Sequence, residues 1–239
     1  MDKLNQAGPA RERVQANYLN VLERIQAAAT RSARESKEIR LIAVTKSVDS
    51  TIARWLVEFG CCDLAESRPQ VLWEKAASLT DLPVRWHMIG HMQRNKVKRT
   101  MPLVSVMHSL DSSRILEQIQ QDLAPRPVPL ELLLELNISG EPDKTGMLIS
   151  SAEELLTEWQ TQNGQFPGLA IEGLMGMGSL NGGLEQARRD FESLRNLRDR
   201  WAIRYGLPLK ELSMGMSDDF EIAIEEGATM VRVGSTLFA

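Results

Sequence analysis

Short apolar runs alternate with longer amphipathic stretches along almost the whole of this 239-residue chain. The runs are rich in branched aliphatic residues, which predicts strands. The stretches between them repeat apolar residues every three or four positions, which predicts helices. A strand paired in parallel with the next needs a crossover, which is nearly always right-handed. Eight candidate strands result, over residues 41–44, 63–65, 84–89, 103–107, 130–136, 169–175, 211–214 and 230–233.

Eight such units in about 200 residues suit a closed (β/α)8 barrel of the TIM type, because an open doubly wound sheet usually has fewer strands. We therefore predict an α/β fold in which residues 37–239 form a single barrel. No linker rich in Ser, Gly or Pro interrupts the alternation. Residues 1–36 are expected to add an N-terminal amphipathic helix over 10–36 that packs on the barrel. The intervening helices are expected over residues 51–59, 70–79, 94–99, 112–121, 152–160, 184–204 and 220–226.

Composition narrows the class of protein. A formal net charge of -4 without long blocks of like charge argues against nucleic acid or a membrane surface as the main partner. The first thirty residues lack a continuous apolar core, so we expect them to form neither a signal peptide nor a membrane span. We therefore expect a cytoplasmic protein. Cys61 and Cys62 are adjacent, a spacing that suits neither a redox pair nor a zinc site. We expect both cysteines to be reduced and to lie half-buried in a strand.

Lys46 closes the first predicted strand and is the first candidate for chemistry. The carboxyl ends of barrel strands form the active-site face, and a lysine partly withdrawn from water there can attack a carbonyl to form a Schiff base. A lysine in this position is also commonly a solvated strand cap. The residue alone does not decide between the two.

Two later segments place candidate phosphate ligands on the same face. Ser217 follows strand seven and is a good N-cap for a helix beginning at Asp218, while Gly234 and Ser235 follow strand eight. The loops after strands seven and eight of such barrels often bind phosphate through backbone amides, and strand eight lies beside strand one. A plain cap and a plain turn explain these residues equally well one by one. Together with Lys46 they predict either a pyridoxal phosphate site or a lysine-dependent phosphosugar aldolase.

Ordered motifs over most of the chain, from about residue 39 to 238, resemble the pyridoxal-phosphate homeostasis protein family, also called YggS-like, with its fold-type III cofactor barrel. The motifs are Leu-Ile-Ala-Val-Thr-Lys at 41–46, His-Met-Ile-Gly-His-Met-Gln-Arg-Asn-Lys at 87–96, Asn-Ile-Ser at 137–139, Lys-Thr-Gly at 144–146, Gly-Leu-Met at 173–175, Leu-Ser-Met-Gly-Met-Ser-Asp-Asp at 212–219 and Met-Val-Arg-Val-Gly-Ser at 230–235.

The resemblance implies a protein of vitamin B6 homeostasis that holds pyridoxal 5'-phosphate (PLP) as a Schiff base on Lys46, without robust catalytic turnover. It implies that Ser217, Gly234 and Ser235 hold the phosphate and that Arg232 faces the pyridine nitrogen. An arginine there can only donate a hydrogen bond, which leaves the ring nitrogen unprotonated and weakens carbanion chemistry. Four methionines at strand ends, Met175, Met177, Met214 and Met216, are candidates to pack on the ring.

Two features depart from the family pattern. Ala65-Glu66-Ser67 replaces the usual Gly-Glu-Asn, so Ser67 brings a short hydroxyl where an amide is usual. The chain also ends at Ala239, where relatives commonly continue, and we expect this to leave the cofactor edge more open to water.

Three alternatives complete the sequence-based hypotheses. An amino-acid racemase uses a similar barrel but carries a second domain with an opposing base, and an aldolase would bind no coloured cofactor. A metal site is disfavoured because His87, His91 and His108 do not share one face. The basic stretch 94–99 is expected to be a solvated face.

We expect a monomer whose partners are PLP and PLP-requiring apoenzymes, with no nucleic acid and no membrane.

Overall fold

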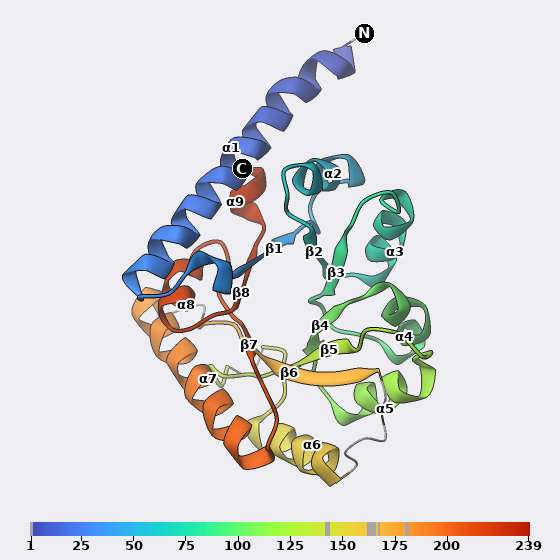
Figure 1. Ribbon diagram of the computed structural model, residues 1–239, viewed down its shortest axis with the longest axis vertical. Coiled ribbons are helices and arrows are strands. Elements are labelled where there is room, and N and C mark those ends of the chain that lie inside the picture. Colours follow the sequence, from blue (N-terminus) through green and yellow to red (C-terminus); the bar gives the residue numbers. More distant parts are fainter. Residues whose placement is uncertain (1, 142–143, 162–165, 167, 180–181) are drawn as a thin grey trace.

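Eight parallel strands close into a barrel surrounded by helices in the computed structural model, which describes residues 2–141, 144–161, 166, 168–179 and 182–239 (Figure 1). The strands are β1 (Arg40–Val44), β2 (Asp63–Glu66), β3 (Arg85–Met88), β4 (Val106–Leu110), β5 (Leu130–Glu135), β6 (Leu169–Met175), β7 (Glu211–Ser213) and β8 (Met230–Val233). The α-helices are α1 (Asp2–Arg31), α2 (Ser50–Glu58), α3 (Pro69–Ser78), α4 (Arg94–Thr100), α5 (Ser113–Asp122), α6 (Ile149–Thr161), α7 (Gly183–Tyr205), α8 (Phe220–Glu225) and α9 (Ser235–Phe238), and η1 (Ser36–Glu38) and η2 (Met101–Leu103) are 3-10 turns. The predicted (β/α)8 barrel is confirmed.

Pairing between the first and last strands closes the barrel. β1 and β8 run parallel, with Arg40 opposite Met230 and Ala43 opposite Val233. This register sets the carboxyl end of β1 beside that of β8, so the residue after Val44 lies close to the loop that begins at Gly234. A Cβ added to Gly234 would come within 3.2 Å of the Val44 carbonyl oxygen, which shows how closely the two segments approach.

The core has two layers, as alternation along barrel strands requires. Most of the buried apolar residues lie between the barrel and the helices. A smaller cluster fills the barrel interior and consists of Ile42, Val44, Ala65, Val106, Leu133, Met175 and Met230. The interior also holds buried polar side chains, among them His87 and His108.

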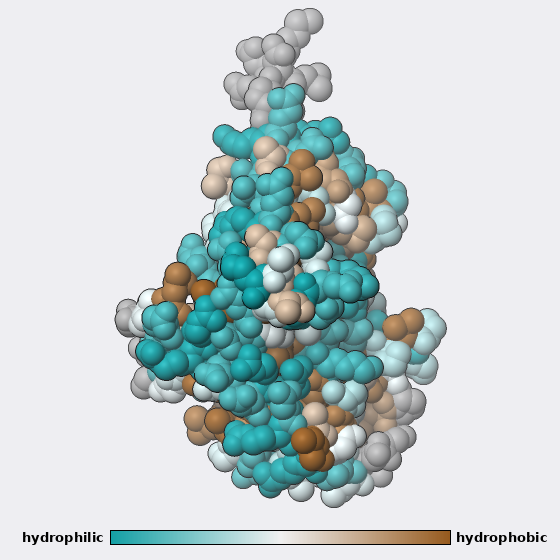
Figure 2. All heavy atoms as spheres, turned by 60° about the vertical axis from the view of Figure 1, so that its left-hand side comes forward, coloured by the Kyte–Doolittle hydropathy of each residue, from teal (hydrophilic) through white to brown (hydrophobic). Residues whose placement is uncertain are grey.

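Helix α1 begins and ends earlier than the predicted 10–36 and packs across the closure of the barrel (Figure 1). Its apolar face buries Val14, Tyr18, Val21 and Ile25, and Arg24 pairs with Glu221 of α8 at 3.1 Å. The face of the molecule turned forward in Figure 2 is mostly hydrophilic. This is expected where amphipathic helices bury one side against the barrel and expose the other to water. No helix in the described part of the chain is both long and apolar enough to cross a membrane.

Two local predictions were wrong. Strand β4 starts at Val106 rather than at 103, because Pro102 lies in the 3-10 turn η2, and His108 therefore lies inside the strand rather than at its end. Cys61 and Cys62 precede β2 instead of belonging to it. Cys61 is buried, which raises the pKa of its thiol to about 12, and both cysteines are free.

A glycine in β6 provides a test of how tightly the barrel wall is packed. A Cβ on Gly173 would lie 1.9 Å from the Glu211 carbonyl oxygen of β7, whereas a Cβ on Gly8 of α1 meets nothing within 4 Å. Gly173→Ala should therefore force the two strands apart and cost about 3 kcal/mol or more, which is roughly 6–12 °C in melting temperature. Gly8→Ala is the control and should melt at or slightly above the wild-type temperature. Equal melting temperatures for the two variants would contradict this packing.

Candidate functional site

A cavity of about 290 Å³ opens at the carboxyl ends of β1, β7 and β8. Its volume is at the lower end of the range for small-molecule sites. It is lined by Val44, Lys46, Ile89, Met216, Ser217, Asp218, Arg232, Gly234 and Ser235. The lining therefore combines an amine, a guanidinium, two hydroxyls and an apolar wall on the face where barrel proteins place their ligands.

Lys46 follows β1 after the fully buried Thr45 and is itself exposed. Of the two environments considered for this residue, a lysine partly withdrawn from water and a solvated strand cap, the structure shows the solvated one, and its amine is open to the cavity. A buried ion pair fixes the backbone before it. Lys75 Nζ donates to the Thr45 carbonyl oxygen at 2.7 Å and to Glu66 Oε1 at 2.6 Å, and Thr45 Oγ1 donates to the same carboxylate.

The loop after β7 presents Ser217 toward the loop after β8. Gly215 makes this turn possible with a φ of +87°, at which a Cβ would clash with Ala223 and Phe220. Ser217 Oγ accepts long hydrogen bonds from Gly234 N at 3.4 Å and Thr236 N at 3.5 Å. Two backbone N–H groups and a hydroxyl thus converge on one corner of the cavity, a pattern that suits an anion.

The apolar pattern predicted a helix from Phe220, and the cap at Ser217 predicted a start at Asp218. The first is confirmed and the second is wrong, because α8 begins at Phe220 and Asp219 takes the N-cap position. Asp219 Oδ1 instead accepts a hydrogen bond from Met216 N at 2.6 Å and closes the turn. Burial raises the pKa of the Asp219 carboxyl. Ser217 is therefore released from capping and remains available to the cavity.

Arg232 forms the inner wall of the cavity and is almost fully buried. Its Nη1 donates to Ser213 Oγ at 2.6 Å and its Nη2 donates to the Gly176 carbonyl oxygen at 3.2 Å. Burial lowers the pKa of this guanidinium to about 10, while Asp219 and Glu135 oppose the change. The guanidinium therefore stays charged at neutral pH, and its two hydrogen bonds hold it in a fixed orientation.

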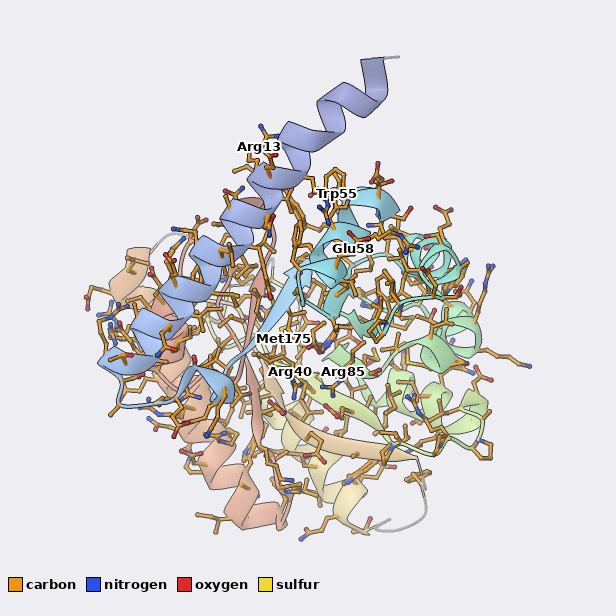
Figure 3. The ribbon with its side chains drawn as sticks, turned by 45° about the horizontal axis from the view of Figure 1, so that its top comes forward. Arg13, Arg40, Trp55, Glu58, Arg85 and Met175 are labelled. Atoms are coloured by element: carbon orange, nitrogen blue, oxygen red, sulfur yellow. The ribbon has the colours of Figure 1, made fainter. Side chains whose placement is uncertain are left out.

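Five of the seven residues predicted for the site line this cavity, namely Lys46, Ser217, Arg232, Gly234 and Ser235. Met175 belongs instead to the apolar cluster of the barrel interior, where Figure 3 labels it near the middle of the ring. Ser67 is not among the lining residues; its backbone packs against Gly90, so closely that a Cβ on that glycine would lie 2.1 Å from the Ser67 oxygen. Of the other methionines only Met216 lines the cavity.

Sequence reasoning missed several lining residues and one buried network. Val44 could have been found, because it lies two positions before Lys46 on the inward face of the strand. His87, His108 and Ser213 were missed as a group that supports Arg232, because their hydrogen bonds join residues up to 105 positions apart. In the part of the chain that the structure describes, no cluster of three or more His, Cys, Asp or Glu side chains is placed to hold a metal.

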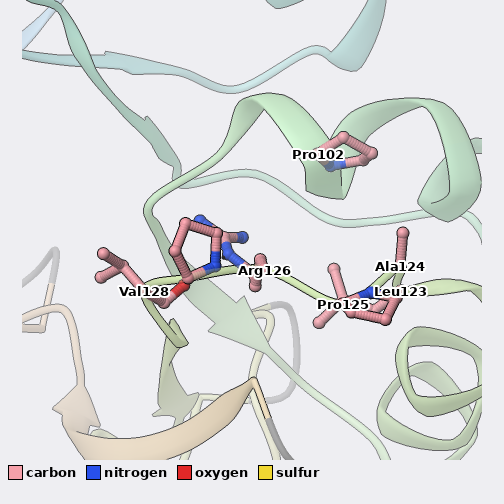
Figure 4. Close-up of a pocket in the computed structure, with 7 residues that line it drawn as sticks. Pro102, Leu123, Ala124, Pro125, Arg126 and Val128 are labelled. Atoms are coloured by element: carbon pink, nitrogen blue, oxygen red, sulfur yellow. Dashed lines mark hydrogen bonds between the residues drawn. The ribbon is translucent and has the colours of Figure 1, made fainter.

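A second hollow, of about 390 Å³, lies around the segment 123–128 before β5, at the opposite end of the strands from Lys46 (Figure 4). Three prolines, Pro102, Pro125 and Pro127, line it together with Arg126. The Arg126 guanidinium donates to the carbonyl oxygens of Val128, Met101 and Val104. This hollow is larger than the cavity at Lys46, but the charged side chain that lines it already holds the surrounding loops together.

Comparisons with known proteins find similarity over most of the chain. A family model described as alanine racemase, N-terminal domain, matches residues 19–239. The chain is 38% identical to a pyridoxal phosphate homeostasis protein of Aquifex aeolicus over 218 residues, which covers 91% of this chain and 94% of the relative. The solved structure of PipY from Synechococcus elongatus, with PLP bound, is 30% identical with a TM-score of 0.79 and covers 92% of this chain and 100% of PipY.

The likeness to solved racemase structures, at low sequence identity, shows the fold alone. Alanine racemase from Streptomyces lavendulae superimposes with a TM-score of 0.74 at 14% identity. The alignment covers 95% of this chain but 56% of the racemase.

The buried histidines predict a pH dependence of stability. Burial lowers the pKa of His87, although Asp63 opposes the change, and burial together with His87, Arg232, Arg40 and Arg85 lowers the pKa of His108 well below 6.5. Below pH 6.5 the unfolded chain therefore binds more protons than the folded chain, and stability falls as the pH falls.

Between pH 6.5 and 5.5 this effect should cost about 1 kcal/mol through His108 and less through His87. Denaturant unfolding of the wild type and of His108→Asn at both pH values measures it. The variant should lose about 1 kcal/mol less than the wild type over this interval. Parallel losses in the two proteins would mean that His108 is not a neutral buried group.

Proposed function

We propose that this chain, which belongs to the alanine racemase N-terminal domain family and to the pyridoxal phosphate homeostasis proteins, binds PLP in the cavity at Lys46. The observation that carries the proposal is the convergence of an amine, an anion-binding corner and a fixed guanidinium on that single cavity. The PLP-bound PipY structure and the names of the relatives support the same ligand.

The residues present fit each part of this cofactor. The exposed Lys46 amine is a nucleophile that can condense with the aldehyde to form a Schiff base, with loss of one water. The phosphate fits the corner formed by Ser217, Gly234 and Ser235. Val44, Ile89 and Met216 supply an apolar wall for the ring.

Arg232 is proposed to face the ring nitrogen, because it forms the inner wall of the cavity while the phosphate corner lies at the loops. When bound, PLP supplies an electron-withdrawing ring and a reactive carbonyl carbon. A charged guanidinium can only donate to the ring nitrogen and cannot protonate it, so the protein limits the ring's capacity to withdraw electrons. The site is thus suited to holding the cofactor more than to carbanion chemistry.

We infer that the protein acts in vitamin B6 and amino-acid or keto-acid homeostasis without robust turnover. The matched relatives are named homeostasis proteins, not enzymes. Racemisation needs an acid and a base on opposite faces of a carbon, and the described residues that line the cavity include no histidine, tyrosine or cysteine. Sustained racemisation of alanine, abolished by Lys46→Ala, would instead establish the racemase alternative.

We also propose a cellular setting for this function. Two free cysteines and a negative net charge are consistent with a reducing cytoplasm. We propose a monomer that exchanges PLP with solution and with apoenzymes that require it, because the exposed Lys46 leaves the reactive edge open to external amines.

Lys46→Ala and Lys46→Arg should both abolish the visible absorbance that PLP acquires on binding, because neither side chain can form the covalent bond. The arginine variant keeps the positive charge and so separates charge from nucleophilicity. Melting temperature should change little in either variant, since Lys46 is exposed. Absorbance and melting are measured on the same samples. A variant that retains the wild-type band would assign the attachment to another lysine.

Ser217→Ala should weaken PLP binding roughly ten- to hundredfold, since losing one hydrogen bond to a charged group costs about 1.5–3 kcal/mol. It should also speed the transfer of PLP to an apoenzyme that needs it. The matched control is Lys98→Ala in the exposed basic stretch of α4, which should bind as the wild type does. Titration by absorbance and recovery of apoenzyme activity are the readouts. Unchanged affinity and transfer for Ser217→Ala would place the phosphate in a different loop.

A further inference from the structure

Four hydrogen bonds in series cross the barrel interior and end on Arg232. Asp63 Oδ1 lies 2.8 Å from His87 Nε2, His87 Nδ1 lies 2.8 Å from His108 Nε2, and His108 Nδ1 lies 2.7 Å from Ser213 Oγ. Arg232 Nη1 completes the series at 2.6 Å from the same hydroxyl. The five side chains come from β2, β3, β4, β7 and β8, so the series links widely separated parts of the barrel wall.

The chemistry of these groups allows one arrangement of protons. Arginine can only donate, so Ser213 Oγ accepts from Arg232 and directs its single proton to His108 Nδ1. His108 then carries its proton on Nε2 and donates to His87 Nδ1. His87 in turn carries its proton on Nε2 and donates to the Asp63 carboxylate.

Both histidines are neutral in this arrangement, as burial requires. His87, His108 and Ser213 have no exposed surface, and burial lowers the pKa of both imidazoles. A protonated His108 would have to donate to Ser213, which would then receive two donors and leave its own proton without an acceptor. Neutral imidazoles give each of the four ring nitrogens and the Ser213 hydroxyl a hydrogen-bond partner.

Stability alone does not account for such a network. Apolar residues of similar volume commonly serve a protein interior as well as or better than a buried polar network, and the neighbouring interior positions are apolar here. The series instead runs in one direction. It starts at Asp63, near Arg85 at the amino end of the strands, and it ends at Arg232, which forms the inner wall of the cavity. Figure 3 labels Arg85 and Arg40 near the middle of the ring.

We propose that Asp63, His87, His108 and Ser213 are positioning residues that fix the guanidinium of Arg232 toward the ring nitrogen of bound PLP. The proposal rests on the proposed function and extends it to residues that do not touch the ligand. Ser213 and the Gly176 carbonyl occupy two of the five N–H groups of Arg232, which leaves the others for the cavity. His108 matters because its Nδ1 accepts the hydrogen bond of the Ser213 hydroxyl, which leaves the Ser213 oxygen free to accept from Arg232.

Two replacements of His108 separate positioning from packing. In His108→Asn the amide oxygen lies where Nδ1 was and can still accept from Ser213. In His108→Gln the amide reaches the Nε2 position and can donate to His87, but it offers Ser213 no acceptor. Ser213→Ala removes the acceptor for Arg232 itself. Val106→Ala, in the same strand and the apolar interior cluster, is the packing control.

Each variant is titrated with PLP, and the Kd, the visible absorption band and the melting temperature are recorded. His108→Asn should keep the wild-type band and a Kd within about threefold, whereas His108→Gln and Ser213→Ala should shift the band and raise the Kd roughly five- to twentyfold. Val106→Ala should lower the melting temperature and leave the band in place. If His108→Gln does not fold, Ser213→Ala decides, since it removes a single oxygen.

The outcomes separate this inference from the function on which it rests. A wild-type protein that takes up no PLP refutes the proposed function and the inference with it. A wild type that binds PLP, with an unshifted band and unchanged affinity in His108→Gln and Ser213→Ala, refutes the inference alone. A band that shifts equally in Val106→Ala also refutes it, because the effect would then come from core packing.

Discussion

Pairing of β1 with β8 brings the parts of the site together. Lys46 and Ser235 are 189 positions apart in the sequence, and only closure of the barrel in the register Ala43 opposite Val233 brings them to one cavity. No local preference of either segment could achieve this. Helix α1 packs across the same closure through α8 and α9, so the N-terminal helix supports the wall that carries the site.

Much of the fold could be predicted from sequence because the signal was local. The apolar runs ending at Val44, Met175 and Val233 each gave a strand with the correct carboxyl end. β4 was misplaced because two of its buried residues, His108 and Ser109, are polar and look like loop residues in a sequence. The short helix α9 was missed because it has four residues, too few for a periodic pattern.

The site was predictable only to the extent that its residues lie at strand ends. Lys46, Arg232 and Gly234 follow that rule, and the motifs around them supplied their expected roles. The release of Ser217 from helix capping depended on Asp219 taking that position instead. The support of Arg232 was hidden, because it runs through side chains of four other strands and through proton positions that only their spatial arrangement determines. His87 and His108, whose positions in the sequence do not suggest a metal site, are therefore part of this support.

Covalent trapping would locate the attachment of PLP. The wild-type protein is incubated with PLP, reduced with borohydride, digested and analysed by peptide mass spectrometry. We expect one dominant modified peptide, containing Lys46, with the mass of reduced PLP on the Nζ amine. Modification concentrated on Lys144 or Lys75, or no modification above that of an unfolded control, would contradict the assignment of the cavity at β1, β7 and β8.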